Sequence, residues 1–132
     1  MKILLFITIL SLSIFSSQDS GKFGWRKLAD KEGLYIEFLF YSEADNTNNG
    51  VVVKLENKND HSVEYDFDLI FRAEDEEKTQ NVKGLLLPKQ ILTGSNEGLF
   101  WVPFKNGKFI SEVGLKNLKA GKKKEDRNPP EN

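Results

Sequence analysis

The chain has no cysteine and a single histidine among its 132 residues. Without cysteine no disulfide can form, so stability has to come from a packed core, which a chain of this length can build. Zinc sites draw three or four ligands from cysteine, histidine and acidic residues, and nucleophilic catalysis pairs a serine or cysteine with a positioned base. The one histidine, His61, lies in the polar stretch KNDHS, where we expect an exposed loop. We therefore predict a protein that is not an enzyme and holds no cofactor.

An excess of charge is missing as well. Nineteen lysines and arginines face twenty acidic residues, which gives a net charge of −1. Domains that bind nucleic acid are usually strongly basic, so we expect no nucleic-acid partner.

Only one long apolar run is present, at residues 3–15, directly after Lys2 and before Ser16 and Ser17. It is too short to span a bilayer comfortably, which takes about 20 residues. A basic start, a short apolar run and small residues are typical of a secretory signal. We predict a signal peptide over residues 1–17, cut after Ser16 or Ser17, and an exported protein, periplasmic or secreted, with no stable membrane span.

Alternating apolar and polar residues dominate the chain from residue 34 onward. The clearest segment is VEYDFDLIFRA (63–73), in which every second residue is apolar and most of the others are charged. This period of two predicts a strand with one face on a core and the other in water. LYIEFLFY (34–41) and VVVKLEN (51–57) follow the same rule. TQNVKGLLLP is expected to form a strand that ends at Pro88, and KQILTGSNEG a bend or a short bridging strand.

The remaining segments complete an all-β pattern. GLFWVPF (98–104) and FISEVGLKNLK (109–119) are predicted strands, joined by a hairpin turn at Asn106 and Gly107. Turns recur every ~8–12 residues, which is typical of an antiparallel sandwich or barrel. We predict an antiparallel β-sandwich domain over residues 34–119. Residues 18–33 are a polar lead segment in which Trp25, Leu28 and Ala29 form one helical turn, and residues 120–132 are a disordered charged tail.

The order of VVVKLEN, VEYDFDLIF, a proline- and glycine-containing segment and FWVPF resembles immunoglobulin-like extracytoplasmic modules of bacteria. The resemblance covers roughly residues 34–119. It implies an immunoglobulin-like β-sandwich of about seven strands, but a rhythm of strands transfers no functional residue. The Cys…Trp…Cys pattern of antibody domains is absent.

GLFWVPF is apolar on both faces of a strand, with Phe100 and Phe104 on one face and Trp101 on the other. Such a strand is either buried on both sides or turned toward a partner on one. We predict a binding site formed by Phe100, Trp101 and Phe104 with Trp25, for an envelope or extracellular protein or a polysaccharide. The alternative is that these residues fill the core. A carbohydrate-binding module is an alternative function, and a small glycoside hydrolase using Asp66 and Asp68 is a more remote one.

EADNTNNGVVVKLE (43–56) has the ligand order of a calcium-binding loop from Asp45 to Glu56. If residues 51–56 are extended, however, Glu56 lies ~20 Å along the strand from Gly50. We therefore expect a turn between two strands, with Glu43 and Asp45 as a weak calcium candidate and no other metal site. The basic residues near the end could touch anionic lipid or polysaccharide, but we expect them to be solvated: Lys119, Lys122, Lys123, Lys124 and Arg127.

Overall fold

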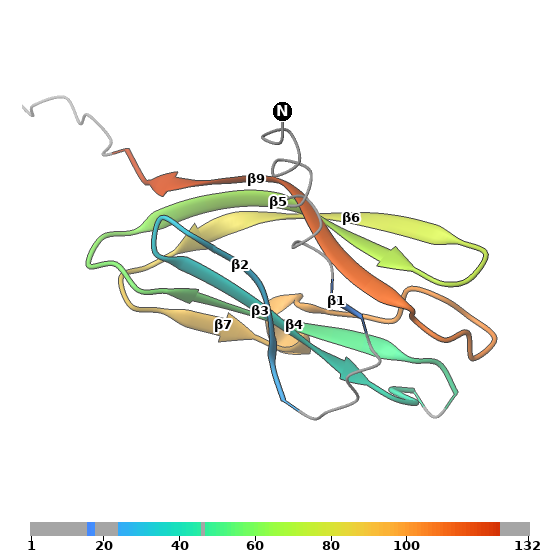
Figure 1. Cartoon of the computed structure of the whole chain (residues 1–132). Helices are drawn as coiled ribbons and strands as arrows, with labels where there is room; N and C mark the ends of the chain where they lie inside the picture. Colours follow the sequence, from blue (N-terminus) through green and yellow to red (C-terminus); the bar gives the residue numbers. More distant parts are fainter. Residues whose placement is uncertain (1–15, 18–23, 46, 125–132) are drawn as a thin grey trace, which may run out of the picture.

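Two antiparallel β-sheets packed face to face make up the protein (Figure 1), as seen in a computed structural model that describes residues 16–17, 24–45 and 47–124. This confirms the prediction of an all-β sandwich. The elements, in chain order, are β1 (Ser16–Ser17), β2 (Arg26–Lys31), β3 (Leu34–Tyr41), β4 (Gly50–Asn57), β5 (Val63–Arg72), β6 (Glu77–Leu86), β7 (Ile91–Thr93), the 3₁₀ turn η2 (Ser95–Glu97), β8 (Phe100–Trp101) and β9 (Glu112–Lys122).

From β2 onward, the chain passes between the sheets three times. We call the sheet with strand order β1-β9-β5-β6 sheet A, and the sheet with order β2-β3-β4-β7, in which β8 also pairs with β4, sheet B. After β4 the chain crosses to sheet A and forms the hairpin β5–β6. It then returns to sheet B as β7 and β8, and ends in sheet A as β9 beside β5 (Figure 1).

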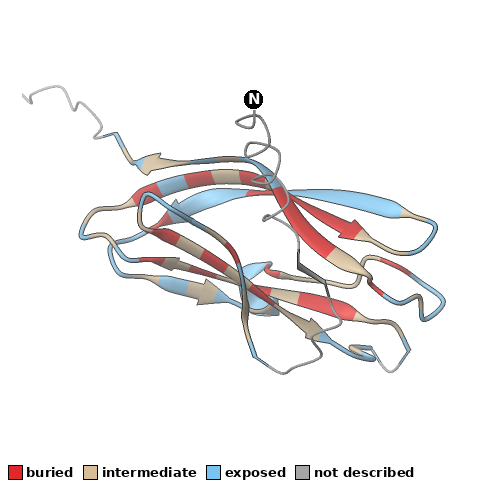
Figure 2. Ribbon diagram, viewed as in Figure 1, coloured by how far each residue is buried: buried red, intermediate tan, exposed pale blue. Residues whose placement is uncertain are grey.

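The core lies between the sheets and is built by the predicted alternation (Figure 2). All five inward positions of β5 are buried: Val63, Tyr65, Phe67, Leu69 and Phe71. Ile70, expected to face water, is also buried, and its neighbour on β9 is Gly114. β6 is an edge strand on which only Val82 and Leu86 are buried, so most of its length faces solvent (Figure 2).

The expected helical turn before residue 34 is wrong. Arg26–Lys31 is a strand, β2, which pairs antiparallel with β3 and shifts register between Lys27 and Ala29. This bulge accompanies the burial of Leu28, which is 6% exposed in the core. Sheet B therefore begins at Arg26, inside the predicted lead segment. Ser16–Ser17, placed in the predicted signal segment, pair with Val113 and Glu112 of β9, while residues 1–15 lie outside the described part of the chain.

The last strand runs further than predicted. β9 continues to Lys122, because Ala120 lies opposite Tyr65 and packs against the core, so the first residues of the expected tail belong to the sheet. Residues 125–132 of that tail lie outside the described residues. GLFWVPF contributes only the two residues of β8, and Pro103, which has no amide to donate, follows shortly after.

The turn at Asn106 and Gly107 is present, with φ values of 63° and 66° and a bond from the Lys108 amide to the Lys105 carbonyl at 3.4 Å. The residues beside it are not paired strands, however. The turn lies on the connection from β8 in sheet B to β9 in sheet A, so the expected hairpin is not formed.

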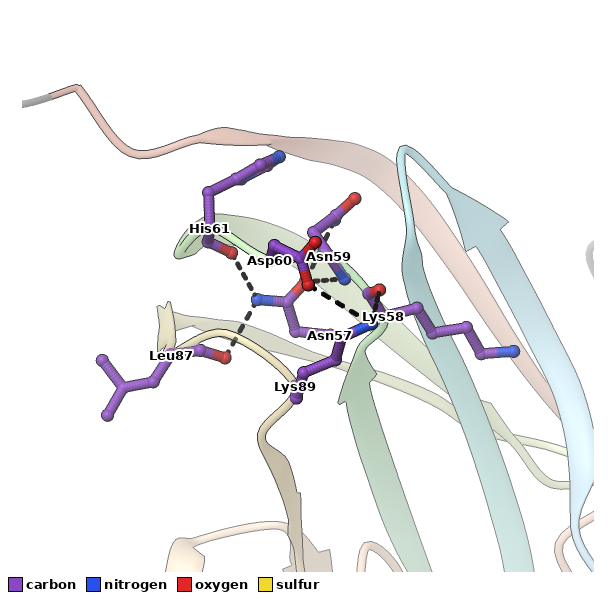
Figure 3. A network of polar contacts seen from close by, with 7 residues as sticks. All are labelled: Asn57, Lys58, Asn59, Asp60, His61, Leu87 and Lys89. Carbon is purple, nitrogen blue, oxygen red and sulfur yellow. Dashed lines mark hydrogen bonds and ion pairs between the residues drawn. The ribbon is translucent and has the colours of Figure 1, made fainter.

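One end of the sandwich is organised around Asn57, a polar residue with no exposed surface (Figure 3). Its side-chain nitrogen donates to the carbonyls of His61 at 2.8 Å and Leu87 at 2.9 Å, and its side-chain oxygen accepts from the Asn59 amide at 2.9 Å. His61 is half-buried in this turn, with ring Nδ1 3.2 Å from the Ser62 carbonyl oxygen. The network holds the β4–β5 loop against the β6–β7 turn.

Candidate functional site

A row of apolar side chains crosses the outer face of sheet B. Leu39 on β3 lies opposite Val52 on β4, and Val52 lies opposite Phe100 on β8. Directly paired residues point to the same face of a sheet, and Leu39 and Val52 alternate with the buried Phe38 and Val53. Trp25, immediately before β2, adjoins the same face. All members are half-buried, and we name the set the outer apolar row: Trp25, Leu39, Val52 and Phe100.

Tyr41 extends this row along β3. Its ring meets the Phe100 ring edge to face, with centroids 6.2 Å apart and an interplanar angle of 87°, and its side chain is 52% exposed. Gly50, paired with Tyr41, makes room for Phe100, since a Cβ added at Gly50 would lie 3.0 Å from a Phe100 ring carbon and 2.9 Å from the Ala44 Cβ. The absence of a side chain at Gly50 thus lets two aromatic rings from distant strands meet at the surface.

The adjacent row on the same face is charged. Lys27 lies opposite Glu37, and Glu37 lies opposite Lys54. The Lys54 Nζ is 3.3 Å from Glu37 Oε1 and 4.5 Å from the centroid of the Trp25 ring. This cation–π contact holds the indole at the sheet surface, beside the boundary between apolar and charged rows.

The four predicted binding residues separate into two pairs. Trp25 and Phe100 reach the outer face. Trp101 lies opposite the buried Val51 and packs toward the core, 6.0 Å from the Phe71 ring, and Phe104 is 1% exposed within it. The prediction that Phe100 and Phe104 share a face assumed a continuous strand, but β8 ends at Trp101, so the alternation stops there.

Leu39, Tyr41 and Val52 were missed as members of this surface. The signal was nevertheless in the sequence, since all three stand at positions that alternation turns away from the core. What the sequence alone does not reveal is that β8 pairs with β4 and brings Phe100 beside them.

No protein-family model matches the chain, and no curated protein matches it either. Among solved structures, the Salmonella enterica trimeric lipoprotein SadB is similar, with a TM-score of 0.46 and 12% identity over 89% of this chain and 72% of that chain. A likeness this distant adds nothing to the assignment of a function.

The calcium-like loop is closed by its own hydrogen bonds. Asp45 Oδ1 accepts from the amides of Thr47 at 3.1 Å and Asn48 at 2.7 Å, and these bonds, the Asn48 amide first, lower the pKa of Asp45. Asn48 Oδ1 accepts from the Gly107 amide at 2.9 Å, and Asn49 donates to the Lys108 carbonyl at 2.8 Å, which docks the loop on the 105–108 turn. Glu43 donates its amide to Asn49 Oδ1 at 3.1 Å.

Glu56, the twelfth position of the calcium-like pattern, lies in β4 opposite Tyr35, in the extended conformation that we expected. Over the described ranges, no three histidine or acidic side chains gather closely enough to hold a metal ion.

The carboxylates of Asp66 and Asp68 lie on the outer face of sheet A and share one amide. Asn81 Nδ2 donates to Asp66 Oδ1 at 2.9 Å and to Asp68 Oδ1 at 3.0 Å, and Asn117 donates to Asp68 Oδ2 at 2.9 Å. The bonds from Asn117 and then Asn81 lower the pKa of Asp68. A glycosidase needs a general acid whose pKa is raised, and Asp68 has the opposite shift.

The structure contains no helix, within the residues it describes, that is long and apolar enough to cross a membrane.

Proposed function

We propose that this chain is an exported, non-enzymatic β-sandwich of the cell envelope or secreted fraction that binds another protein through the outer apolar row and Tyr41. The observation that carries the proposal is a difference between the two outer faces. Sheet A presents mostly charged and amide side chains, as a solvated sheet face should. Sheet B has a charged row too, but beside it lies a row of aromatic and aliphatic side chains.

The arrangement on sheet B matches the anatomy of a protein interface. Interfaces place aromatic and aliphatic residues at the centre and charged residues at the rim. Here Tyr41 and Phe100 form the aromatic centre, and the charged row with Lys27, Glu37 and Lys54 borders it. Tyr41 is 52% exposed to water, and a partner that covers it would bury the apolar surface of its ring.

Other features support the remaining parts of the proposal. The apolar run after Lys2 supports export. The lowered pKa of Asp68 argues against Asp68 as the general acid of a glycosidase. The chain leaves sheet B after β4, forms β5 and β6 in sheet A, and returns to pair with β4 as β7 and β8. This order of strands supports a similarity to immunoglobulin-like modules. The alternative of a carbohydrate-binding module through Trp25 is weaker, since Lys54 already covers one face of that indole.

The test compares two surface variants in pull-downs from the envelope fraction of the source organism. Tyr41→Ser/Val52→Thr makes the patch polar while Val52→Thr keeps the shape of the side chain. The matched control is Leu87→Ser, which removes an apolar side chain that is as exposed as Tyr41, at 52%, and lies just after β6, outside the outer apolar row. We expect the patch variant to lose partners that the wild type and the control retain, with an unchanged melting temperature. Retention of every partner by the patch variant would contradict the proposal.

A further inference from the structure

A shallow groove of about 690 Å³ crosses the outer face of sheet A, from β6 over β5 to β9. It lies between two rows of directly opposed residues. One row is Leu85, Glu64 and Gly121, and the other is Lys83, Asp66 and Lys119. Between these two rows lies one further row of paired residues: Gly84, Tyr65 and Ala120.

One glycine leaves a wall of the groove open, and a second leaves room for the side chain that packs beneath it. Gly121 has no atom within 4 Å of the place where a Cβ would stand, so this part of one wall is empty space. At Gly84 an added Cβ would lie 2.6 Å from the Tyr65 hydroxyl, so the Tyr65 side chain fills the opposite, inner side of the sheet. The groove is thus open outward and closed beneath.

Positive and negative side chains alternate across the groove. Lys83 and Lys119 flank Asp66 on its two neighbouring strands, and Lys122 stands at the rim. Within the described residues, none of these three lysines lies at ion-pairing distance from a carboxylate. In the part of the chain that the structure describes, no carboxylate therefore occupies the donors of these ammonium groups.

We propose that this groove binds an acidic polysaccharide, whose carboxylate or sulfate groups pair with Lys83 and Lys119. Glu64 and Asp66 accept hydrogen bonds from sugar hydroxyls, and Leu85, 39% exposed, packs against the apolar face of a sugar ring. Strands lie ~4.8 Å apart, so the two lysines are ~10 Å apart at the backbone. A chain with repeated acidic groups can therefore pair with both at once.

The two carboxylates favour a polysaccharide over an anionic membrane. A lipid surface presents a dense layer of anions, which Glu64 and Asp66 would repel, whereas a sugar chain carries hydroxyl donors between its charges. The site is independent of the outer apolar row, because it lies on the other sheet. A failure here leaves the function proposed for sheet B untouched.

Isothermal titration of the full chain with oligogalacturonate tests the proposal. We expect measurable binding that weakens with added salt, and no binding of neutral dextran. Lys83→Gln/Lys119→Gln should weaken binding by at least about tenfold, since two charge-assisted contacts are lost. Lys27→Gln/Lys105→Gln removes the same charge from exposed positions outside the groove and should leave the affinity unchanged.

Gly121→Val provides a test that does not depend on charge. The new side chain enters open space in a strand, where β-branched residues fit well, so the fold should be as stable as before while the groove is filled. We expect oligogalacturonate binding to be lost.

Three outcomes would overturn the proposal: no binding by the wild type, an equal loss in the Lys27/Lys105 control, or unaltered binding by Gly121→Val. Binding to phosphatidylglycerol vesicles without binding to oligogalacturonate would assign the groove to a membrane surface. If inorganic phosphate binds as tightly as oligogalacturonate, the groove is a site for small anions and the proposal is wrong.

Discussion

The side-chain amide of Asn57 donates to the carbonyl of Leu87 at 2.9 Å, so a fully buried amide joins the end of β4 to the turn after β6. The same side chain accepts from Asn59, whose own amide donates to the Glu32 carbonyl in the β2–β3 turn at 2.8 Å. Asn57 thus joins the β4–β5 loop to the β6–β7 turn directly (Figure 3), and it reaches the β2–β3 turn through Asn59. Its position closes one end of the sandwich.

Replacing Asn57 with alanine should lower the free energy of unfolding by about 2–3 kcal/mol, because the carbonyls of His61 and Leu87 each lose a donor and the Asn59 amide loses its acceptor. Urea denaturation followed by circular dichroism measures the loss. Asn96→Ala is the control, since Asn96 is exposed in η2. If both variants unfold at the same urea concentration, the network has no role in stability.

A second prediction concerns the contact that supports the aromatic pair. Gly50→Ala places a Cβ 2.9 Å from Ala44 and 3.0 Å from the Phe100 ring, so it should cost about 1–3 kcal/mol through overpacking. Ala44→Gly in the same chain removes the nearer clash and should restore part of that loss, which a double-mutant cycle detects. Additive effects of the two changes would contradict the close approach of Gly50 to Ala44.

The alternation of residues was sufficient to predict the sheets, as β5 illustrates, because a strand half-buried against a core leaves a period of two in the sequence. It failed at β2, where polar residues conceal a single inward leucine, Leu28, beside a bulge. The alternation also failed at β8, because its residues lie in a continuous apolar run that does not distinguish the inner from the outer face. Trp101 and Phe104 were therefore predicted in a binding site with Trp25 and Phe100, although both pack toward the core.

Long-range pairing explains what remained hidden. The outer apolar row exists because β8 returns to β4, and the groove exists because β9 aligns Lys119 with Asp66. Neither the pairing of β8 with β4 nor that of β9 with β5 can be predicted from a short segment of the sequence. The calcium-like loop shows the converse, since its flanking strands were enough to predict a turn.

The contact between Lys54 and Trp25 predicts a fluorescence change. Lys54→Gln removes the cation from the indole face and should shift Trp25 emission to longer wavelength and increase its quenching by acrylamide. The loss of stability should be below about 1 kcal/mol, since the ammonium is partly solvated. Lys105→Gln is the control, and because Trp101 is the second tryptophan, both proteins are also measured in a Trp101→Phe background. Identical spectra for Lys54→Gln and its control would contradict the contact.

The hydrogen bonds to Asp68 predict how stability depends on pH. Its pKa is lowered from the ordinary value of 3.8, first by Asn117 and then by Asn81, so the ionised form is favoured in the folded protein. A group whose pKa is lower when folded stabilises the fold above its unfolded pKa, and that contribution is lost as the pH falls through the folded value. Asn117 has a φ of 57°, so Asn117→Gly keeps the backbone conformation while deleting the amide. We expect the Asp68 carboxyl pKa, followed by NMR, to rise in this variant. The stability difference from wild type should shrink below pH 3.8, where the unfolded carboxyl is protonated as well. A difference that stays constant from neutral to acid pH would mean that Asn117 acts through the backbone alone.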